Sequence, residues 1–291
     1  MLYVFIKLIS KIVQILPEKF LFLIVDLLAR VIWFKLKFTP FHNFIQNNIR
    51  QAFKDRYTSC EIEDLTRRHL SCLLKSLVEF MRLPGLNLDQ LEKKIKIKNI
   101  HYLDEALNKG RGVILLSAHF GNWEMGAALL GLKGYPIYAM YQEQSSKSID
   151  RWLNEVRLSK GVRPVWRWQT LRRIITLLKT GCIIAIMGDQ HGEFENVFAE
   201  FFGHRVSVPA GPVAFALKTG AQIIPAFMIR NADDTHTEVF EPPLELTRTG
   251  NRKRDLEENS LKFLRIFEKY ISWYPEQWFW VYNRWDKLRK K

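Results

Sequence analysis

The chain contains few cysteines and lacks several short motifs that identify common enzyme classes. Among its 291 residues only Cys60, Cys72 and Cys182 are cysteines, and no Cys-x-x-Cys occurs. An odd number without paired spacing does not indicate a disulfide framework, so we expect the catalytic part to face the cytosol. Because Gly-x-Gly-x-x-Gly, a P-loop and a Gly-x-Ser-x-Gly elbow are all missing, neither a nucleotide cofactor nor a serine hydrolase is expected.

Metal-binding residues occur without a recognisable spacing. The candidate ligands of a zinc hydrolase would be His119, Glu124, Asp189, His191 and His204. Their spacing fits no known metal-binding motif. The sequence therefore predicts no metal site.

The N-terminal residues 1–38 are rich in Leu, Ile, Val and Phe, but they contain no stretch that predicts a membrane-spanning helix. The best segment, residues 20–34, is interrupted by Asp26 and Arg30, whereas spanning needs about 20 apolar residues. No small-residue cleavage site follows a single apolar stretch, as a secretory signal would require. We expect two amphipathic helices, separated by Pro17, that lie in the membrane interface; two soluble core helices are the alternative.

Hydrophobic residues make up 47% of the chain and aromatic residues 13%, which is ample for a packed core. The formal net charge is +14. A surplus of this size indicates an acidic partner such as an anionic membrane surface, an acidic carrier protein or nucleic acid; a solvated basic surface without a partner is the alternative.

Residues 39–291 are expected to form one α/β domain. Residues 40–95 have helical periodicity, and Pro84-Gly85 interrupts it. Buried strands are then predicted at residues 113–116, 136–140, 182–187 and 223–228. Helices are predicted at residues 123–132, 148–159, 171–179, 210–218 and 256–271. This alternation is typical of a largely parallel sheet flanked by helices.

A candidate catalytic pair follows the first of these strands. His119 lies just beyond the strand, at the edge where ligands of open α/β sheets bind. Gly121 allows a sharp turn, and Asn122 is a suitable N-cap for the next helix. Glu124 would then lie in the first helical turn, where its carboxylate could hold one imidazole nitrogen and leave the other to accept a proton. The His-x₄-Glu spacing alone is weak evidence, since a histidine at a strand end is more often structural.

The longer string Leu-Ser-Ala-His-Phe-Gly-Asn-Trp-Glu, residues 116–124, resembles the signature of the bacterial lipid A late acyltransferases. These lauroyl and myristoyl acyltransferases belong to the lysophospholipid acyltransferase superfamily. Further blocks similar to the family's follow the same order along the chain: residues 48–53, Arg157, residues 188–190, 201–203 and 209–212, Pro225, and residues 277–285.

The resemblance implies transfer of a fatty acyl group from acyl carrier protein, or less often coenzyme A, to a glycolipid hydroxyl. His119 would be the general base and Glu124 its orienting partner, with no cofactor beyond the thioester co-substrate. Backbone amides at the start of the helix capped by Asn122 would stabilise the oxyanion. Substrate-binding roles are implied for four residues: Asn122, Arg157, Asp189 and Gln190. Asp189 could position Arg157 or the acceptor sugar. The expected location is the cytoplasmic face of the bacterial inner membrane.

One departure from the family concerns the loop before the helix that carries Arg157. The family has an Arg and an Asn there, whereas residues 141–146 contain neither. Another acceptor, such as a phosphatidylinositol mannoside, is therefore an alternative to the lipid A precursor. A different class of function, a basic protein that binds membranes or nucleic acid without catalysis, would use residues 157–173. The side chains of that stretch that could bind nucleic acid are Arg157, Lys160, Arg163, Trp166, Arg167, Trp168, Arg172 and Arg173.

Overall fold

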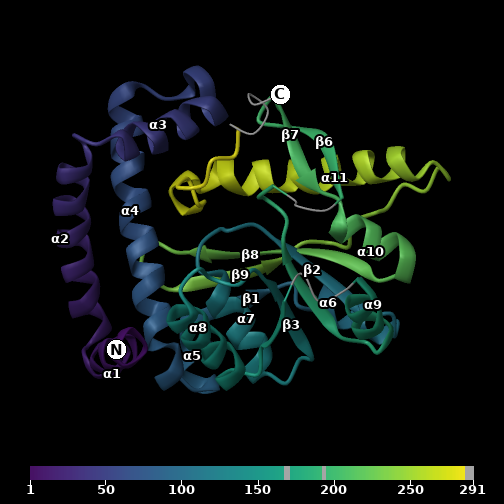
Figure 1. Cartoon of the computed structure of the whole chain (residues 1–291), viewed down its shortest axis with the longest axis horizontal. Helices are drawn as coiled ribbons and strands as arrows, with labels where there is room; N and C mark the ends of the chain where they lie inside the picture. Colours follow the sequence, from purple (N-terminus) through teal and green to yellow (C-terminus); the bar gives the residue numbers. More distant parts are fainter. Residues whose placement is uncertain (167–170, 192–194, 286–291) are drawn as a thin grey trace.

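The computed structural model describes residues 1–166, 171–191 and 195–285. A seven-stranded sheet with the order β1-β9-β8-β2-β5-β3-β4 lies between two layers of helices (Figure 1). Its strands are β1 (Ile95–Lys98), β2 (Val113–Ser117), β3 (Ile137–Tyr141), β4 (Arg163–Trp166), β5 (Ile183–Met187), β8 (Gln222–Arg230) and β9 (His236–Phe240). Neighbouring strands are parallel except β8 and β9. The predicted α/β class, a largely parallel sheet flanked by helices, is confirmed.

The alternation of side chains along β2 shows how the two layers form. Ile114 and Leu116 join one core cluster with residues of α9 (Leu171–Lys179), α10 (Gly211–Thr219) and α11 (Arg252–Trp273). Val113 and Leu115 join another on the opposite face, with α6 (His101–Asn108). Because both faces of the sheet are covered, β5 is apolar throughout and β2 is apolar up to its last residue, Ser117. The segments that follow β2 and β5 therefore leave the sheet from strands that are buried except at their last residues.

The helices of the α/β part lie close to their predicted positions. The helix α7 occupies Trp123–Leu132 as predicted, and α8 occupies Lys147–Ser159. Strands β1, β4 and β9 were not predicted, and neither was the separate antiparallel hairpin of β6 (Asn196–Phe201) and β7 (His204–Pro209). These strands are short or alternate apolar with polar residues, so they lack the continuous apolar runs on which the prediction rested.

The N-terminal segment forms the two predicted helices, α1 (Leu2–Ile15) and α2 (Glu18–Leu36), on either side of Pro17. They are followed by α3 (Pro40–Phe53), α4 (Ser59–Arg82) and α5 (Leu88–Lys94). Figure 1 shows α2, in purple, running beside α4. In α2 the packed face includes Leu21, Val25 and Ala29. No helix of the described residues combines the length and apolar character needed to cross a membrane.

The other face of α1 and α2 is apolar and exposed. Its large side chains are Leu2, Val4, Phe5, Leu8, Ile12, Ile15, Phe20, Leu23, Leu27, Leu28, Val31 and Phe34. So many large apolar side chains exposed on two helices are rare on soluble monomers and mark a surface that something else covers.

Candidate active site

Two adjacent parallel strands bring the central side chains of the site together. In the β2–β5 pair, Ser117 lies opposite Met187, the last residue of its strand. His119 and Asp189 are each two residues beyond that pair, at the carboxyl edge of the sheet. The strand register therefore places the two side chains next to each other, although 70 residues separate them along the chain.

The imidazole of His119 is held by the carboxylate of Asp189. The distance from His119 Nδ1 to Asp189 Oδ1 is 2.8 Å, and the backbone N–H of His119 donates to Asp189 Oδ2 at 3.0 Å. The indole of Trp278 donates to the same oxygen at 2.8 Å. An ionised Asp189 requires that Nδ1 carry the proton, which leaves Nε2 as an acceptor. Nε2 has no hydrogen-bond partner among the described residues, and the His119 side chain is 23% exposed.

The charge of Asp189 is stable in this environment. Burial by itself would raise the pKa of Asp189, but the His119 imidazole and the hydrogen bonds from Trp278 and the His119 backbone outweigh it and lower the pKa below its ordinary value. The side chain is 2% exposed, so the carboxylate is fixed and shielded from water. His119 and Asp189 together form a base whose tautomer is set by a buried anion.

The structure does not bring Glu124 to the imidazole, so the expected contact between His119 and Glu124 is not formed, and a catalytic role for Glu124 stays a prediction. Glu124 lies in the first turn of α7 as predicted, but both of its carboxylate oxygens bind Arg157 of α8, at 2.5 Å and 3.0 Å. A bidentate pair with a guanidinium is stronger than a single bond to a neutral imidazole, which explains the orientation. Asp189 binds His119. It does not position Arg157, which was one of the roles expected from the sequence, because Arg157 binds Glu124.

The Glu124–Arg157 pair borders the loop that departs from the family. Its two side chains are 16% and 15% exposed, and the Arg157 guanidinium lies 5.8 Å from the ring centre of Tyr141, the last residue of β3. The loop continues through Gln144, whose backbone N–H donates to Asp150 at the start of α8. The altered loop is therefore in contact with the second charged group of the site.

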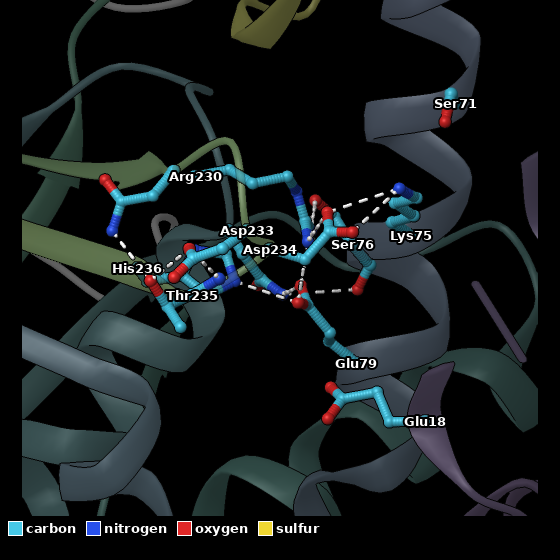
Figure 2. A network of polar contacts seen from close by, with 12 residues as sticks. Glu18, Ser71, Lys75, Ser76, Glu79, Arg230, Asp233, Asp234, Thr235 and His236 are labelled. Atoms are coloured by element: carbon cyan, nitrogen blue, oxygen red, sulfur yellow. Dashed lines mark hydrogen bonds and ion pairs between the residues drawn. The ribbon is translucent and has the colours of Figure 1, made fainter. Parts of the chain in front are cut away.

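Asn122 is the N-cap of α7, as the sequence predicts. Its Oδ1 accepts from the backbone N–H of Met125 at 3.3 Å, and its Nδ2 donates to Glu79 of α4 at 2.7 Å. Glu79 also binds Arg230 and His236, and Figure 2 shows these groups converging on its carboxylate. Burial would raise the pKa of Glu79, but His236 and Arg230 outweigh it and lower the pKa to about 2. The side chain of Asn122 is thus committed to holding the start of α7.

The segment after α11 clamps the turn that carries His119. The backbone of Phe279 donates to His119 O at 3.0 Å, and Gly121 donates to Gln277 O at 2.9 Å. Gly121 has a φ of +59°, and a Cβ at this position would lie 1.8 Å from the carbonyl oxygen of Met228. Only glycine fits this turn.

Trp278, which completes the His119–Asp189 contact, was missed as a functional residue. The sequence analysis identified the block of residues 277–285 that contains it, but no local pattern indicates that its indole reaches Asp189. Arg284 of the same segment is completely buried and donates to Ser207 O at 2.7 Å. Burial lowers the pKa of Arg284 to about 10.

The remaining predicted site residues lie as follows. Gln190 follows Asp189 and is half-buried. His204 binds the backbone of Gln51, away from His119. Across residues 1–166, 171–191 and 195–285, no three His, Cys, Asp or Glu side chains are grouped as a metal site would need.

The basic stretch proposed for nucleic acid is partly occupied by internal contacts. Arg157 binds Glu124, and Lys160 is 6% exposed and donates to Leu86 O at 2.6 Å. Arg167 and Trp168 lie outside the described residues. Where it is described, this stretch does not form a continuous exposed cationic face.

Comparison with known proteins agrees with the resemblance found in the sequence. Residues 2–287 match the family described as bacterial lipid A biosynthesis acyltransferase. The phosphatidylinositol mannoside acyltransferase of Mycolicibacterium smegmatis is 27% identical over 77% of this chain and 73% of that protein. The lipid A biosynthesis acyltransferase 2 of Shigella flexneri is 25% identical over 80% and 74%. The lipid A biosynthesis palmitoleoyltransferase of Escherichia coli is 26% identical over 67% of this chain and 62% of its own length.

Proposed function

Because the chain belongs to the bacterial lipid A biosynthesis acyltransferase family, we propose that it transfers a fatty acyl group from a thioester of acyl carrier protein, or of coenzyme A, to a hydroxyl of a glycolipid. The observation that carries this proposal is the His119–Asp189 contact of 2.8 Å at the carboxyl edge of the sheet. It gives the site a base with a free acceptor nitrogen, which is what the deprotonation of a hydroxyl needs.

This geometry supports the following reaction. Nε2 of His119 takes the proton of the acceptor hydroxyl as the hydroxyl oxygen attacks the thioester carbonyl carbon. Asp189 stabilises the imidazolium that forms. The tetrahedral intermediate carries its negative charge near the start of α7, where backbone N–H groups and the helix dipole favour an anion. The intermediate collapses by breaking the C–S bond, and the leaving thiolate takes the proton from His119. The products are an ester and a thiol.

Glu124 and Arg157 act in this proposal as a substrate-binding pair and not as part of the base. Arg157 retains donors that can reach a phosphate or the thioester region, and Glu124 fixes the direction of its guanidinium. Gln190 and the amides around Asn122 complete the polar surface. A lipid A precursor is the first acceptor proposed. A phosphatidylinositol mannoside is the second, because the relative from Mycolicibacterium smegmatis carries that name and the loop at residues 141–146 departs from the lipid A pattern.

We also propose that α1 and α2 lie in the cytoplasmic surface of the bacterial inner membrane. Their exposed apolar face would enter the boundary of the lipid tails, and the net charge of +14 would attract anionic head groups. The same charge suits the acidic acyl carrier protein as donor. Nucleic acid is not a proposed partner.

A panel experiment tests the proposal. The full-length protein is incubated with acyl carrier protein and coenzyme A thioesters, each against a lipid A precursor and a phosphatidylinositol mannoside, and the products are analysed by mass spectrometry. We expect one acceptor to gain the mass of one acyl group, with the wild-type protein and not with His119→Gln. Absence of product from every pair, with a folded protein and intact substrates, would contradict the function.

A further inference from the structure

A cavity lies between α2, α4, the β8–β9 turn and the segment that follows α11. It has a volume of about 600 Å³, which is within the usual range for sites that bind small molecules. Four arginines from three parts of the chain line it: Arg30, Arg67, Arg68 and Arg230. Two carboxylates, Asp26 and Glu276, also lie in its wall.

The carboxylates in and around this cavity already have cationic partners. Asp26 binds Lys75 at 3.2 Å, and Glu276 binds Arg68 at 3.1 Å. Asp64 is shared by Arg67 and Arg68, at 2.6 Å and 2.9 Å. Both carboxylates of the described wall are thus paired with a lysine or an arginine of the protein itself.

The guanidinium groups differ in how far their donors are used. Arg230 is 5% exposed and bound by Glu79 and Asp234, as Figure 2 shows, so it is a fixed part of the wall. Arg67 and Arg68 are 40% and 47% exposed and keep N–H groups that their contacts with Asp64 and Glu276 leave unused. Arg30 is exposed and makes no hydrogen bond or ion pair within the described part of the chain. The cavity therefore offers donors for an anion that the protein itself does not supply.

The position of the cavity relates it to lipid on one side and to His119 on the other. The helix α2 contributes Arg30 to the wall and also carries the exposed Leu27, Val31 and Phe34 of its apolar face. On the inner side, Cys72, Arg230, Glu276 and Gln277 line both this cavity and the small pocket that contains His119 and Trp123. A lipid whose tails lie against α2 would have its head group at the arginines and within reach of the pocket of the base.

We propose that this cavity binds the phosphate-bearing head group of the acceptor lipid, with Arg30 and Arg67 as its main ligands. This inference rests on the function proposed above, because that function identifies the lipid as the acceptor. The binding itself depends only on the arginines and on the phosphate.

The binding test uses a soluble probe, dihexanoyl phosphatidate below its critical micelle concentration, titrated calorimetrically into the full-length protein. We expect Arg30→Gln and Arg67→Gln each to weaken binding about tenfold, the size expected for a hydrogen bond to a charged group. Arg254→Gln is the control matched to Arg67→Gln, because each is a helix-surface arginine that pairs with a carboxylate at 2.6 Å, Asp64 for Arg67 and Glu258 for Arg254. It should bind as the wild type does, and dihexanoylglycerol, which lacks the phosphate, should not bind measurably.

Three results would overturn the site. Wild-type affinity in Arg30→Gln or in Arg67→Gln would show that one of the two proposed main ligands does not bind the phosphate. An equal loss in Arg254→Gln would reduce the effect to net charge. Inorganic phosphate binding as tightly as the phosphatidate would show a free-anion site without lipid specificity.

A kinetic test separates this inference from the proposed function. With the acceptor identified by the panel, Arg30→Gln should raise the acceptor KM about tenfold and leave kcat and the donor KM unchanged. An unchanged acceptor KM would refute the acceptor assignment while acyl transfer stands. If the panel yields no transfer, the proposed function fails, whereas the titration still decides whether the cavity binds a phosphate head group.

Discussion

Replacing Asp189 with asparagine would test the catalytic pair without changing its shape. In the wild type, Oδ1 accepts from His119 Nδ1, and Oδ2 accepts from the His119 backbone and from Trp278. If the NH₂ of the new side-chain amide faced the latter two donors, both would be buried without an acceptor, at a cost of about 1–3 kcal/mol each. The opposite orientation keeps the amide oxygen on those donors and turns the NH₂ toward Nδ1. This orientation is therefore favoured.

An NH₂ group facing Nδ1 forces the proton of His119 onto Nε2. The imidazole then holds the wrong tautomer to accept a proton from the acceptor hydroxyl, and the loss of the anion removes the stabilisation of the imidazolium. We expect kcat to fall about 10⁴-fold, with little change in the unfolding midpoint. The assay is steady-state formation of the acylated product, followed by mass spectrometry, with circular dichroism as the control for folding. A rate for Asp189→Asn within about threefold of the wild type, well inside the tenfold that about 1.4 kcal/mol represents, would refute the reasoning.

Three further results are expected. Glu124→Gln weakens the partly buried pair with Arg157, so the KM of one substrate should rise. We expect kcat to fall less than about tenfold, a change worth about 1.4 kcal/mol. A loss of kcat as large as that of Asp189→Asn would show that Glu124 is part of the catalytic base. Burial raises the pKa of Glu238 from its ordinary value of 4.5 to about 8. Its contribution to stability is therefore fully present below the ordinary pKa and is lost as the pH rises from there through about 8. Urea unfolding at pH 5 and pH 8 should show a loss on the order of 4 kcal/mol in the wild type that Glu238→Gln lacks, and parallel pH dependences would contradict this. Leu27 and Phe34 are both exposed on α2, and replacing both with glutamate should reduce co-sedimentation with anionic vesicles about tenfold or more. The control Phe198→Glu, at an exposed residue of β6, should not reduce it. Equal co-sedimentation of all variants would argue against helices that lie in the membrane interface.

The sequence allowed the local features of the site to be predicted. The strand before His119 and the limits of α7 were predicted from apolar periodicity, and the cap at Asn122 was predicted from its residue type and position. Each of these depends on residues within one or two turns of each other. The strand predicted at residues 182–187, which Asp189 follows, is likewise present as β5.

The pairing of these features could not be predicted, because it depends on the order of strands in the sheet. That β2 and β5 are neighbours is a long-range property with no local signal. Without knowledge of this pairing, the nearby Glu124 was the natural partner for His119. That Arg157 of α8 binds the Glu124 carboxylate instead was not considered. Knowledge of the register alone would have identified Asp189, since both residues lie two positions beyond the paired residues Ser117 and Met187.

The central claim is that Asp189 acts on the reaction through His119. It is tested most directly by a double-mutant cycle that compares product formation, over long incubations, by His119→Ala, Asp189→Asn and the double variant. Residues that act as one unit are strongly non-additive, so the double variant should be no slower than His119→Ala alone. A double variant slowed by the product of the two single effects would show that Asp189 acts independently of His119 and would contradict the account.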